Sequence, residues 1–534
     1  MTLDIEVAGL RLRYGTVTAL DDLSFKLPGG RIYGLLGRNG SGKTSLLSVL
    51  AGFRKASEGT VLVGDRPVFE NPAVTRRVCL IRETGDTGDR DDRVTDALST
   101  ASHLRPGWDG DYADSLVDRF QVPRRKKLGE LSLGQRSALG MTFGLASRAP
   151  VTLFDESHLG MDAPSRAAFH DEVLSDFMAH PRTIVISTHL IDELSPLFEE
   201  VVIIDRPAGA PGRDRGTTGP GRGRHRPGRC GRPVRGRPHR APRAPARPDQ
   251  VGHGLRRARR GAPPPGPRRR PRPGPGRPPG PVRPPHRADR RTPMSTQADD
   301  RTWSIARLLF ATQLPFLVIV WVVFAAAVVV LTVAIHVLGT VNRSVWDPAV
   351  TVVRWFALGY GVYLVYRLLP VLVAHGRTRR EFLRSIALFV VAAGAVVAAL
   401  LAAGFAVEGL LYRVLDLPQR VAPERLFDAP TQYPRIFLSY WAMLMVWTTI
   451  GLLLGAGFYR SGGNELVVLV LALAMVVVSG YGIGFNGLPF VGAVVDVADL
   501  PLAGSLALCL AGLAPGVAVT WALVRDLPIR NRVA

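Results

Sequence analysis

The amino-acid character of this 534-residue chain changes abruptly at Arg206 and again at Met294. Residues 1–205 have the mixed composition of a water-soluble α/β domain, whereas residues 294–534 contain long uncharged apolar runs such as Phe316–Ile335. Between them, Arg206–Pro293 is dominated by Arg, Pro, Gly and Ala. Such a composition buries too little apolar surface to offset chain entropy. Two folded parts, 1–205 and 294–534, separated by a disordered segment, 206–293, are therefore predicted.

The charge of the chain resides in that middle segment. The chain has a formal net charge of +23, and Arg206–Pro293 alone carries 26 Arg, no Lys, 3 Asp and no Glu. The remaining residues are neutral, with 41 basic and 41 acidic side chains. The high pI therefore gives no reason to expect nucleic-acid binding by the folded parts.

Three interpretations of Arg206–Pro293 compete: a disordered linker, an Arg-rich arm for nucleic acid or anionic lipid, and out-of-frame translation. The third is favoured, because a GC-rich gene read out of frame yields Arg, Pro, Gly and Ala. Read one base later, the codons from Arg206 permit G-R-L-V-L-L-D-E-T-E-E-L, and Met294–Ser295 permits a stop codon overlapping a new start. Two neighbouring genes, encoding two subunits, are then joined in this chain.

A phosphate-binding loop is indicated by GRNGSGKT at Gly37–Thr44. It follows an apolar strand, Ile32–Leu36, and precedes a helical run, Ser45–Leu50. In that context backbone N–H groups and a helix N-terminus cradle phosphates, Lys43 reaches the β- and γ-phosphates and Thr44 holds Mg²⁺.

The loop alone occurs in many protein families, and two further motifs reduce their number: LSLGQ at Leu131–Gln135 and VTLFDE at Val151–Glu156. With the loop, they resemble the ATP-binding cassette (ABC) family over essentially all of residues 1–205. The implied fold is an α/β P-loop NTPase, and the implied cofactors are ATP and Mg²⁺. The buried strand Val151–Phe154 points Asp155 and Glu156 to the loop end of a parallel sheet, where phosphoryl-transfer groups are needed.

The resemblance also implies a role for each site residue. Glu156 polarises the attacking water, Asp155 supports Mg²⁺, and Glu83 stands where Gln usually contacts the metal. His189 in STHL follows a predicted strand, Thr183–Ser187, and contacts the γ-phosphate. Tyr14 stacks on adenine. Ser132 and Gly134 reach the nucleotide of the opposite subunit in a head-to-tail dimer, and Asp162 crosses its interface. The nucleotide-contacting set is Tyr14, Gly37, Asn39, Gly40, Ser41, Gly42, Lys43, Thr44, Ser45, Glu83, Ser132, Gly134, Gln135 and Asp162.

Some positions depart from the family pattern. Glu83 adds negative charge beside the metal, Leu133 replaces the common Gly, and SHLGMD after Glu156 replaces the usual Pro-Thr form. We expect ATP hydrolysis to survive these changes, but the sequence does not predict its rate.

Residues 294–534 predict an all-α membrane domain of six spans near the required length of about 20 residues. The predicted spans are Leu314–Leu338, Val350–Val373, Ile386–Val407, Ile436–Phe458, Leu466–Ile483 and Leu502–Val524. The positive-inside rule places both termini in the cytoplasm. Arg354 and Arg367 fall within the second span, where each is expected to snorkel, pair or face a pathway.

The basic segment His375–Ser385 resembles the short cytoplasmic coupling helix of ABC-2-type export permeases, and we expect it to dock near Glu83. A plain positive-inside loop is the alternative. The chain is thus predicted to be a plasma-membrane ABC transporter, favouring export, with its ATPase cytoplasmic, in contact with lipid and with no nucleic-acid partner. The alternatives are a true single-chain half-transporter and a soluble ABC ATPase joined artefactually to an unrelated membrane protein.

Overall fold

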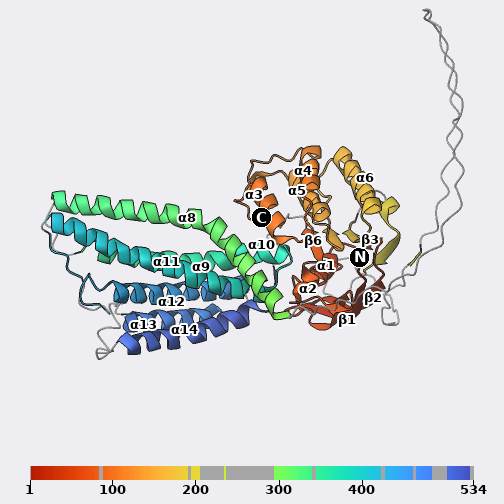
Figure 1. The fold of residues 1–534 in the computed structure, drawn as a ribbon. Helices are drawn as coiled ribbons and strands as arrows, with labels where there is room; N and C mark the ends of the chain where they lie inside the picture. Colours follow the sequence, from red (N-terminus) through yellow and green to blue (C-terminus); the bar gives the residue numbers. More distant parts are fainter. Residues whose placement is uncertain are drawn as a thin grey trace, which may run out of the picture. The chain divides into compact units, whose positions relative to one another are not determined.

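The computed structural model describes residues 2–82, 88–189, 194–204, 234–235, 294–338, 344–415, 417–421, 427–460, 465–483 and 502–529 (Figure 1). Glu83 and, apart from Val234–Arg235, the segment 206–293 lie outside the described residues. The domain boundaries at 205/206 and 293/294 therefore stay predictions.

The centre of the ATPase half is a six-stranded sheet. Its order is β10 (Val234–Arg235), β9 (Glu200–Ile203), β3 (Ile32–Leu36), β8 (Thr183–Ser187), β7 (Val151–Asp155) and β6 (Val78–Arg82). All neighbours pair in parallel except β10, which is antiparallel to β9. Every residue of β3, β6, β7 and β8 is buried, as expected for parallel strands covered on both faces. The strands predicted at 32–36, 151–154 and 183–187 are confirmed.

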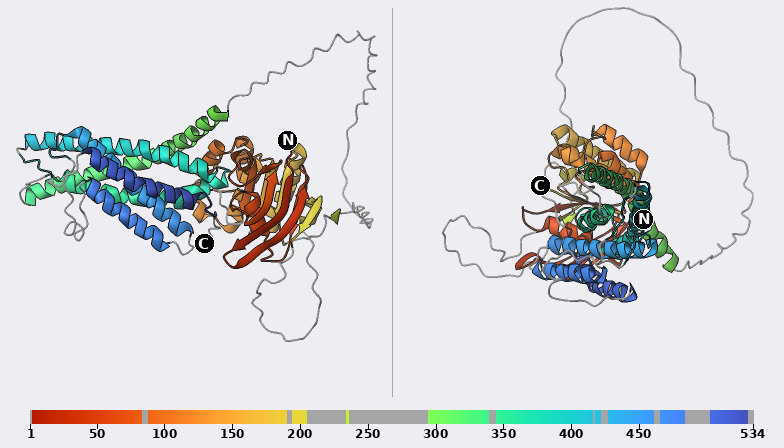
Figure 2. Two further views of the ribbon diagram at one scale, coloured as in Figure 1. Left: turned by 90° about the horizontal axis from the view of Figure 1, so that it is seen from below. Right: turned by 90° about the vertical axis from the view of Figure 1, so that its left-hand side faces the viewer.

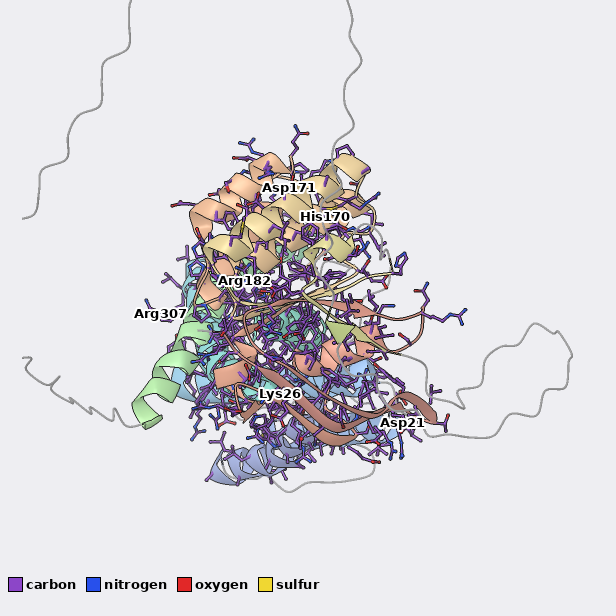
Figure 3. All side chains as sticks on the ribbon, turned by 90° about the vertical axis from the view of Figure 1, so that its right-hand side faces the viewer. Asp21, Lys26, His170, Asp171, Arg182 and Arg307 are labelled. Atoms are coloured by element: carbon purple, nitrogen blue, oxygen red, sulfur yellow. The ribbon has the colours of Figure 1, made fainter. Side chains whose placement is uncertain are left out.

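A second, antiparallel sheet lies beside the first and contains the two long strands seen in Figure 2. Its order is β2 (Val17–Leu27), β1 (Ile5–Tyr14), β4 (Glu58–Val63) and β5 (Arg66–Pro67). One face is charged: Asp21 and Lys26 project from β2 (Figure 3), and Asp21 pairs with Arg11 at 2.7 Å. The opposite face supplies Ile5, Val7 and other core residues. This alternation is the pattern of a half-buried antiparallel sheet.

Helices complete the ATPase half. They are α1 (Lys43–Leu50), α2 (Pro72–Thr75), α3 (Val94–Leu104), α4 (Gly110–Arg119), the 3₁₀ turn η1 (Leu128–Glu130), α5 (Leu133–Ala146), α6 (Ala163–Ala179) and the 3₁₀ turn η2 (Ser195–Leu197). The ten residues from Ser137 to Ala146 in α5 are all buried, so the helix after LSLGQ packs into the core.

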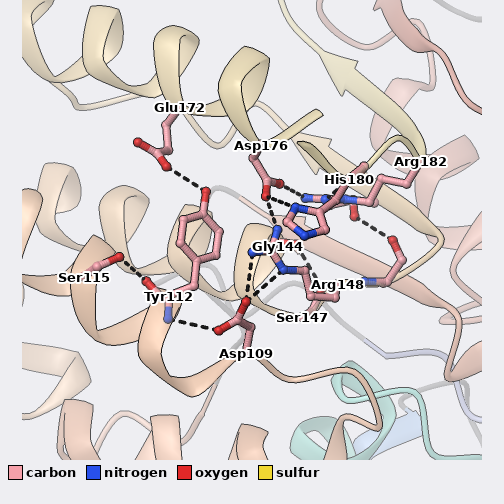
Figure 4. Close-up of polar contacts among 12 residues, drawn as sticks. Asp109, Tyr112, Ser115, Gly144, Ser147, Arg148, Glu172, Asp176, His180 and Arg182 are labelled. Atoms are coloured by element: carbon pink, nitrogen blue, oxygen red, sulfur yellow. Dashed lines mark hydrogen bonds and ion pairs between the residues drawn. The ribbon is translucent and has the colours of Figure 1, made fainter. Parts of the chain in front are cut away.

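An ion-pair network joins α4, α5 and α6 (Figure 4). Arg148, just after α5, pairs with Asp176 of α6 and with Asp109, the N-cap of α4, the latter at 2.9 Å. Arg182 also pairs with Asp176, whose side chain is only 2 % exposed. Because Asp176 accepts from two guanidinium groups while buried, its charge is compensated and it fixes the helices together.

The C-terminal part of the chain, residues 294–534, is called the membrane half after its predicted spans, and it consists mainly of long apolar helices. They are α8 (Met294–Leu338), α9 (Trp346–Tyr363), a π-helical turn η3 (Leu364–Leu368), α10 (Leu369–Ala374), α11 (Arg379–Val414), α12 (Tyr433–Arg460), α13 (Glu465–Ile483) and α14 (Leu502–Val524). All six predicted spans fall on these helices. Among the described residues, five segments are long and apolar enough to cross a membrane, and a shorter apolar helix, Glu465–Gly480, covers most of the predicted fifth span.

Glycines let α9 and α12 approach closely. A Cβ at Gly451 would lie 2.0 Å from the carbonyl oxygen of Leu358, and one at Gly361 would lie 2.4 Å from that of Thr448. Small residues at helix contacts are the usual means of close packing where no hydrophobic drive between helices exists.

A buried carboxylate fixes the start of α9. Glu408 of α11 accepts hydrogen bonds from the backbone N–H groups of Val345 and Trp346, both at 2.9 Å, and from the Ser344 hydroxyl at 2.6 Å. The side-chain amide of Gln419 also donates to it at 3.0 Å. The first backbone N–H groups of a helix lack acceptors within the helix, and the Glu408 carboxylate is the acceptor for those of Val345 and Trp346.

Candidate nucleotide site and its contact with the membrane half

The phosphate-binding loop runs from the end of β3 into α1, as predicted. Gly40 and Gly42 have positive φ angles of 76° and 101°, a conformation that glycine adopts without strain. A Cβ at Gly37 would lie 2.5 Å from the Ile204 carbonyl oxygen. Lys43 donates to the Gly37 carbonyl at 2.8 Å, so its ammonium group is folded back over the loop.

Three predicted catalytic side chains meet at the ends of β7 and β8. Glu156 Oε1 lies 3.5 Å from Lys43 Nζ, and Glu156 Oε2 lies 3.2 Å from His189 Nδ1. Glu156 has a positive φ of 50°, uncommon for a non-glycine residue and a feature that gathers at functional sites. The sheet thus brings together residues 43, 156 and 189 from three separate segments.

Asp155 lies beneath this group at the end of β7. Its carboxyl is 5 % exposed, and burial raises its pKa, opposed by the hydroxyls of Thr44 and Ser187 and by the charge of Arg82. Its Oδ1 atom and the hydroxyl of Ser41 are buried without a hydrogen-bond partner among the described residues. Unsatisfied buried oxygens beside Thr44 fit a Mg²⁺ ion, which takes oxygen ligands.

The predicted adenine-stacking residue is accessible. Tyr14 ends β1, is 39 % exposed, and its hydroxyl lies 3.0 Å from the Ser45 hydroxyl. The guanidinium carbon of Arg54 lies 4.3 Å from the centre of its ring. One face of the ring is therefore already covered by a cation, and its stacking role stays a prediction.

The LSLGQ motif forms the N-terminus of α5. Ser132 is the N-cap, accepting from Gln135 N–H at 3.2 Å, while the Gln135 side chain accepts from Ser132 N–H at 3.2 Å. A Cβ at Gly134 would lie 2.7 Å from the Gly160 carbonyl oxygen, so the motif packs on the loop before Asp162. Asp162 caps α6, and its hydrogen bond with Ser165 lowers its pKa. Ser132 and Asp162 are exposed, and so accessible to a second subunit.

Two residues near the site were not predicted. Arg82 ends β6 opposite Asp155, is buried, and donates to the Ser48 hydroxyl at 3.3 Å. His158 is buried, and its Nε2 lies 3.1 Å from the hydroxyl of Thr188, the neighbour of His189. A sequence signal existed for both, since Arg82 is a charge at the end of an apolar strand and His158 follows Glu156. The remaining predicted ligand, Glu83, lies outside the described residues.

A second constellation joins the ATPase half to the membrane half. Arg379, the first residue of α11, is 1 % exposed, and its Nη1 lies 3.1 Å from Glu70 Oε1. Its guanidinium also donates to the carbonyls of Gly52 at 3.1 Å, Phe53 at 2.8 Å and Leu527 at 2.7 Å. A fully buried guanidinium with a paired carboxylate and three carbonyl acceptors has its hydrogen-bonding demand met.

The chain just before α11 adds further contacts. Gly376 has a φ of 81°, and a Cβ there would lie 2.5 Å from the Thr75 carbonyl oxygen, so only glycine fits without movement. The Thr75 hydroxyl donates to the Gly376 carbonyl at 2.7 Å. Arg105 donates to the Ala374 carbonyl and, at 2.9 Å, to that of Val78. Side-chain donors of the ATPase half therefore reach backbone carbonyls of the segment before α11.

His375 is buried at the same contact, 6.2 Å between ring centres from Phe143 of α5. Burial lowers its pKa to about 3, with the charges of Arg105 and Arg377 acting in the same direction. The imidazole is thus neutral at physiological pH, and its Nδ1 lies 2.8 Å from the Val371 carbonyl.

The sequence prediction for His375–Ser385 needs one correction. The segment is not a separate short helix, because Thr378 caps α11 in a capping box with Glu381, and the helix continues from Arg379 to Val414. The Thr-x-x-Glu signal for a helix start was present in the sequence. On the ATPase half, this part of the chain contacts α2, the turns on either side of α2, and Arg105.

Comparison with known proteins agrees with the motifs. A family model described as ABC transporter matches residues 20–158. The chain is 28 % identical over 186 residues to the ABC transporter ATP-binding protein YtrB of Bacillus subtilis, covering 35 % of this chain and 63 % of that protein. It is 30 % identical to the daunorubicin resistance ATP-binding protein DrrA3 of Streptomyces coeruleorubidus, covering 38 % of this chain and 65 % of that protein.

A third relative is the Nod factor export ATP-binding protein I of Burkholderia orbicola, at 29 % identity over 38 % of this chain and 67 % of that protein. The chain spans less than two thirds of the length of the Bacillus and Streptomyces relatives. The matched region contains the phosphate-binding loop, LSLGQ and Glu156. Residues 20–158 of this chain are an ABC transporter ATPase domain.

Proposed function

We propose that this chain carries the ATPase and the permease of an ABC transporter that exports a substrate across the plasma membrane. The observation that carries the proposal is the convergence of Lys43, Glu156 and His189, with Glu156 within 3.5 Å of both basic groups. A carboxylate held between an ammonium and an imidazole at the end of a parallel sheet suits the orientation of a water molecule toward a γ-phosphate.

In this proposal each residue has a defined task. The loop N–H groups between Gly37 and Thr44 bind the phosphates, and Lys43 leaves Glu156 to neutralise the β- and γ-phosphates. Glu156 is then free to accept a hydrogen bond from water, and His189 turns to the γ-phosphate. The existing Lys43–Glu156 pair holds the acid in place before ATP arrives.

Thr44 and Asp155 would hold Mg²⁺, whose charge would offset that of the phosphates. The buried, unpartnered Oδ1 of Asp155 supports this assignment. Burial raises the pKa of the Asp155 carboxyl, and the hydroxyls of Thr44 and Ser187 and the charge of Arg82 oppose this rise. Glu83 stays a predicted ligand.

A head-to-tail pair of ATPase domains completes each site in this proposal. Ser132 and Asp162 are exposed N-caps, with the hydroxyl and carboxylate at the ends of two helices. The α5 N-terminus carries a partial positive charge and can receive a partner's γ-phosphate.

The Arg379–Glu70 contact supports a transporter over a soluble ABC ATPase. A buried guanidinium donating to the Gly52 and Phe53 carbonyls ties α11 to the chain just after α1, and its pair with Glu70 ties it to the turn before α2. Closure of two ATPase domains would pull on α11 and shift the membrane helices. Export is favoured because one relative is named a Nod factor export protein.

We further propose that the ATPase and permease are separate subunits in the cell and that Arg206–Pro293 is out-of-frame translation. The composition of the segment supports this, with 26 Arg and no Lys. Sequencing the DNA that encodes residues 195–300 tests it. A one- or two-base change near codon 206 that opens a frame ending at Met294 is expected, whereas an intact printed frame would make the chain a single half-transporter.

ATP hydrolysis by the purified chain in lipid nanodiscs tests the main proposal. The wild-type protein should release phosphate from Mg²⁺–ATP, and Lys43→Ala should abolish both ATP binding and release. Arg13→Ala, at an exposed side chain of β1, is the control and should hydrolyse ATP like the wild type. A wild-type protein that binds no ATP would refute the proposal.

A further inference from the structure

Arg367 lies in an interrupted stretch of the second span. The turn Leu364–Leu368 is π-helical, with the Leu369 N–H donating to the Leu364 carbonyl five residues back. Pro370 explains the interruption, because it has no N–H to continue the α-helical hydrogen bonds. Single π-helical turns within α-helices are frequent at functional sites.

The Arg367 guanidinium spans two carboxylates of the ATPase half. It pairs with Asp89 and, at 3.0 Å, with Asp91 Oδ2. Asp89 is mostly buried, with 13 % of its side chain exposed, while the Asp91 side chain is 68 % exposed. Two nitrogens of one guanidinium on two carboxylates give a directional contact that a single ion pair lacks.

Asp89 and Asp91 belong to a turn held by its own hydrogen bonds. Asp89 accepts from the Asp91 N–H at 3.2 Å, and Asp92 accepts from the Asp89 N–H at 3.0 Å. Burial raises the pKa of Asp92, while the charge of Arg367 opposes the rise. The three acids lie close together, so the charge of Arg367 offsets the repulsion among them, as does that of Lys127, whose Nζ lies 3.8 Å from Asp91 Oδ1.

The turn is hydrogen-bonded to the segment that leads into the LSLGQ motif. The N–H of Leu128 donates to the Asp92 carbonyl at 2.9 Å, and the N–H of Gly129 donates to the Arg90 carbonyl at 2.8 Å. A Cβ at Gly88 would lie 2.7 Å from the Leu128 side chain, so the two segments are in close contact. Only Glu130 and Leu131 separate this contact from Ser132, the N-cap of α5.

We propose that Arg367 is a positioning residue for ATP hydrolysis. By holding the Asp89–Asp92 turn, it fixes the chain at Leu128–Leu131 and hence Ser132, which faces the partner's nucleotide. The second span thereby sets the position of the LSLGQ motif, through a route separate from the Arg379–Glu70 contact. This inference rests on the proposed ATPase and transport function.

Kinetics of ATP hydrolysis by the full chain in nanodiscs test the inference. Arg367→Ala should lower kcat by about 5- to 10-fold, at the low end of typical coupling between sites, and leave KM for ATP within twofold. KM is spared because the phosphate-binding loop and Tyr14 are untouched. Arg384→Ala, an equal loss of charge at an exposed position of α11, is the matched control and should keep the wild-type kcat.

Charge exchange separates a specific contact from a general effect on folding. The double variant Arg367→Asp with Asp91→Arg should recover at least half of the kcat lost in Arg367→Asp alone. Asp91→Ala removes the other partner of the same ion pair, at an exposed side chain of the ATPase half. It takes the place of the Arg367 variants if those do not fold, and it should also lower kcat.

The outcomes are distinguishable. If wild-type protein hydrolyses no ATP, the proposed function fails. If wild-type protein hydrolyses ATP while Arg367→Ala and Asp91→Ala keep kcat within twofold of Arg384→Ala, the inference is overturned and the proposed function stands. A loss that the charge exchange does not recover would also overturn it.

Discussion

Arg379 of the membrane half and Glu70 of the ATPase half form an ion pair of 3.1 Å, in which the arginine side chain is 1 % exposed and the glutamate 8 %. The backbone N–H groups of Arg379 and Arg380 also donate to Glu70, at 3.0 and 3.2 Å. Glu70 therefore caps the start of α11 and neutralises a buried cation at the same time. Through this double role Glu70 stabilises the attachment of the two halves.

Glu70→Ala should weaken this attachment by about 3–5 kcal/mol, because a buried guanidinium is left without its counter-ion. The measurement is unfolding of the full chain by denaturant in detergent, together with ATP hydrolysis. Arg380→Ala is the control, since the Arg380 side chain is exposed and only its backbone contacts Glu70. Equal stability of the two variants would contradict the buried pair.

His375 predicts a pH dependence of the same attachment. Because its pKa is lowered to about 3, the attached state binds fewer protons than the detached state, whose histidine has its ordinary pKa of 6.5. The stabilisation of the attached state by neutral His375 is complete above pH 6.5. It is lost as the pH falls below 6.5, at about 1.4 kcal/mol per pH unit. Unfolding between pH 7.5 and 5 measures the slope.

The variant His375→Asn should reduce that slope, whereas His103→Asn, at an exposed histidine of α3, should keep it. Arg105 and Arg377 surround the imidazole and stay charged over this range, so they contribute no titration of their own. A slope unchanged in His375→Asn would show that other groups cause it.

Glu408 predicts a stability effect confined to the membrane half. Glu408→Ala removes the acceptor for four donors at 2.6–3.0 Å. The Trp346 N–H is then left without this acceptor, and the Val345 N–H keeps only the longer hydrogen bond to the Tyr412 hydroxyl, at 3.3 Å. The expected loss is about 2–4 kcal/mol, since each buried donor left unpaired costs about 1–3 kcal/mol. Glu465→Ala, at the first turn of α13, is the control. Thermal unfolding in detergent should show a lower midpoint for Glu408→Ala only.

Local signals were sufficient for the parallel strands beside the candidate nucleotide site and for most helices. The buried strands at 32–36 and 183–187 and the last span, 502–524, have the predicted bounds, because apolar length and flanking residues define them. Contacts between distant segments carried no such signal. Arg367 was expected to snorkel, pair or face a pathway, and its partners, Asp89 and Asp91, lie more than 270 residues away and could not be named from sequence.

The helix after His375 shows a second limit. Thr378 and Glu381 form a capping box, and α11 begins at Arg379. The apolar run of the sequence begins only at Ile386, so the sequence predicts a separate short helix for the basic segment before it. Positive charge at a helix start is uncommon, and here Glu70 offsets it from another part of the chain. A tertiary contact thus overrides a local preference.

Deletion of Arg206–Pro293 tests the interpretation of the middle segment. Two purified polypeptides, 1–205 and 294–534, should assemble in nanodiscs and hydrolyse ATP at a rate within twofold of the full chain, because the Arg379–Glu70 contact between the halves lies outside the deleted segment. Size-exclusion chromatography and phosphate release provide the measurement. Loss of activity on separation would identify the segment as a functional part of the protein.

Glu156→Gln tests the central claim most directly, with ATP binding and ATP hydrolysis measured on the same protein. Glutamine keeps the size of the side chain, but it removes the charge that lies 3.2 Å from His189 and 3.5 Å from Lys43. If Glu156 orients the attacking water, hydrolysis should fall roughly 10²–10⁴-fold while ATP still binds and accumulates in an ATP-bound dimer. Hydrolysis at the wild-type rate by Glu156→Gln would contradict this role of Glu156.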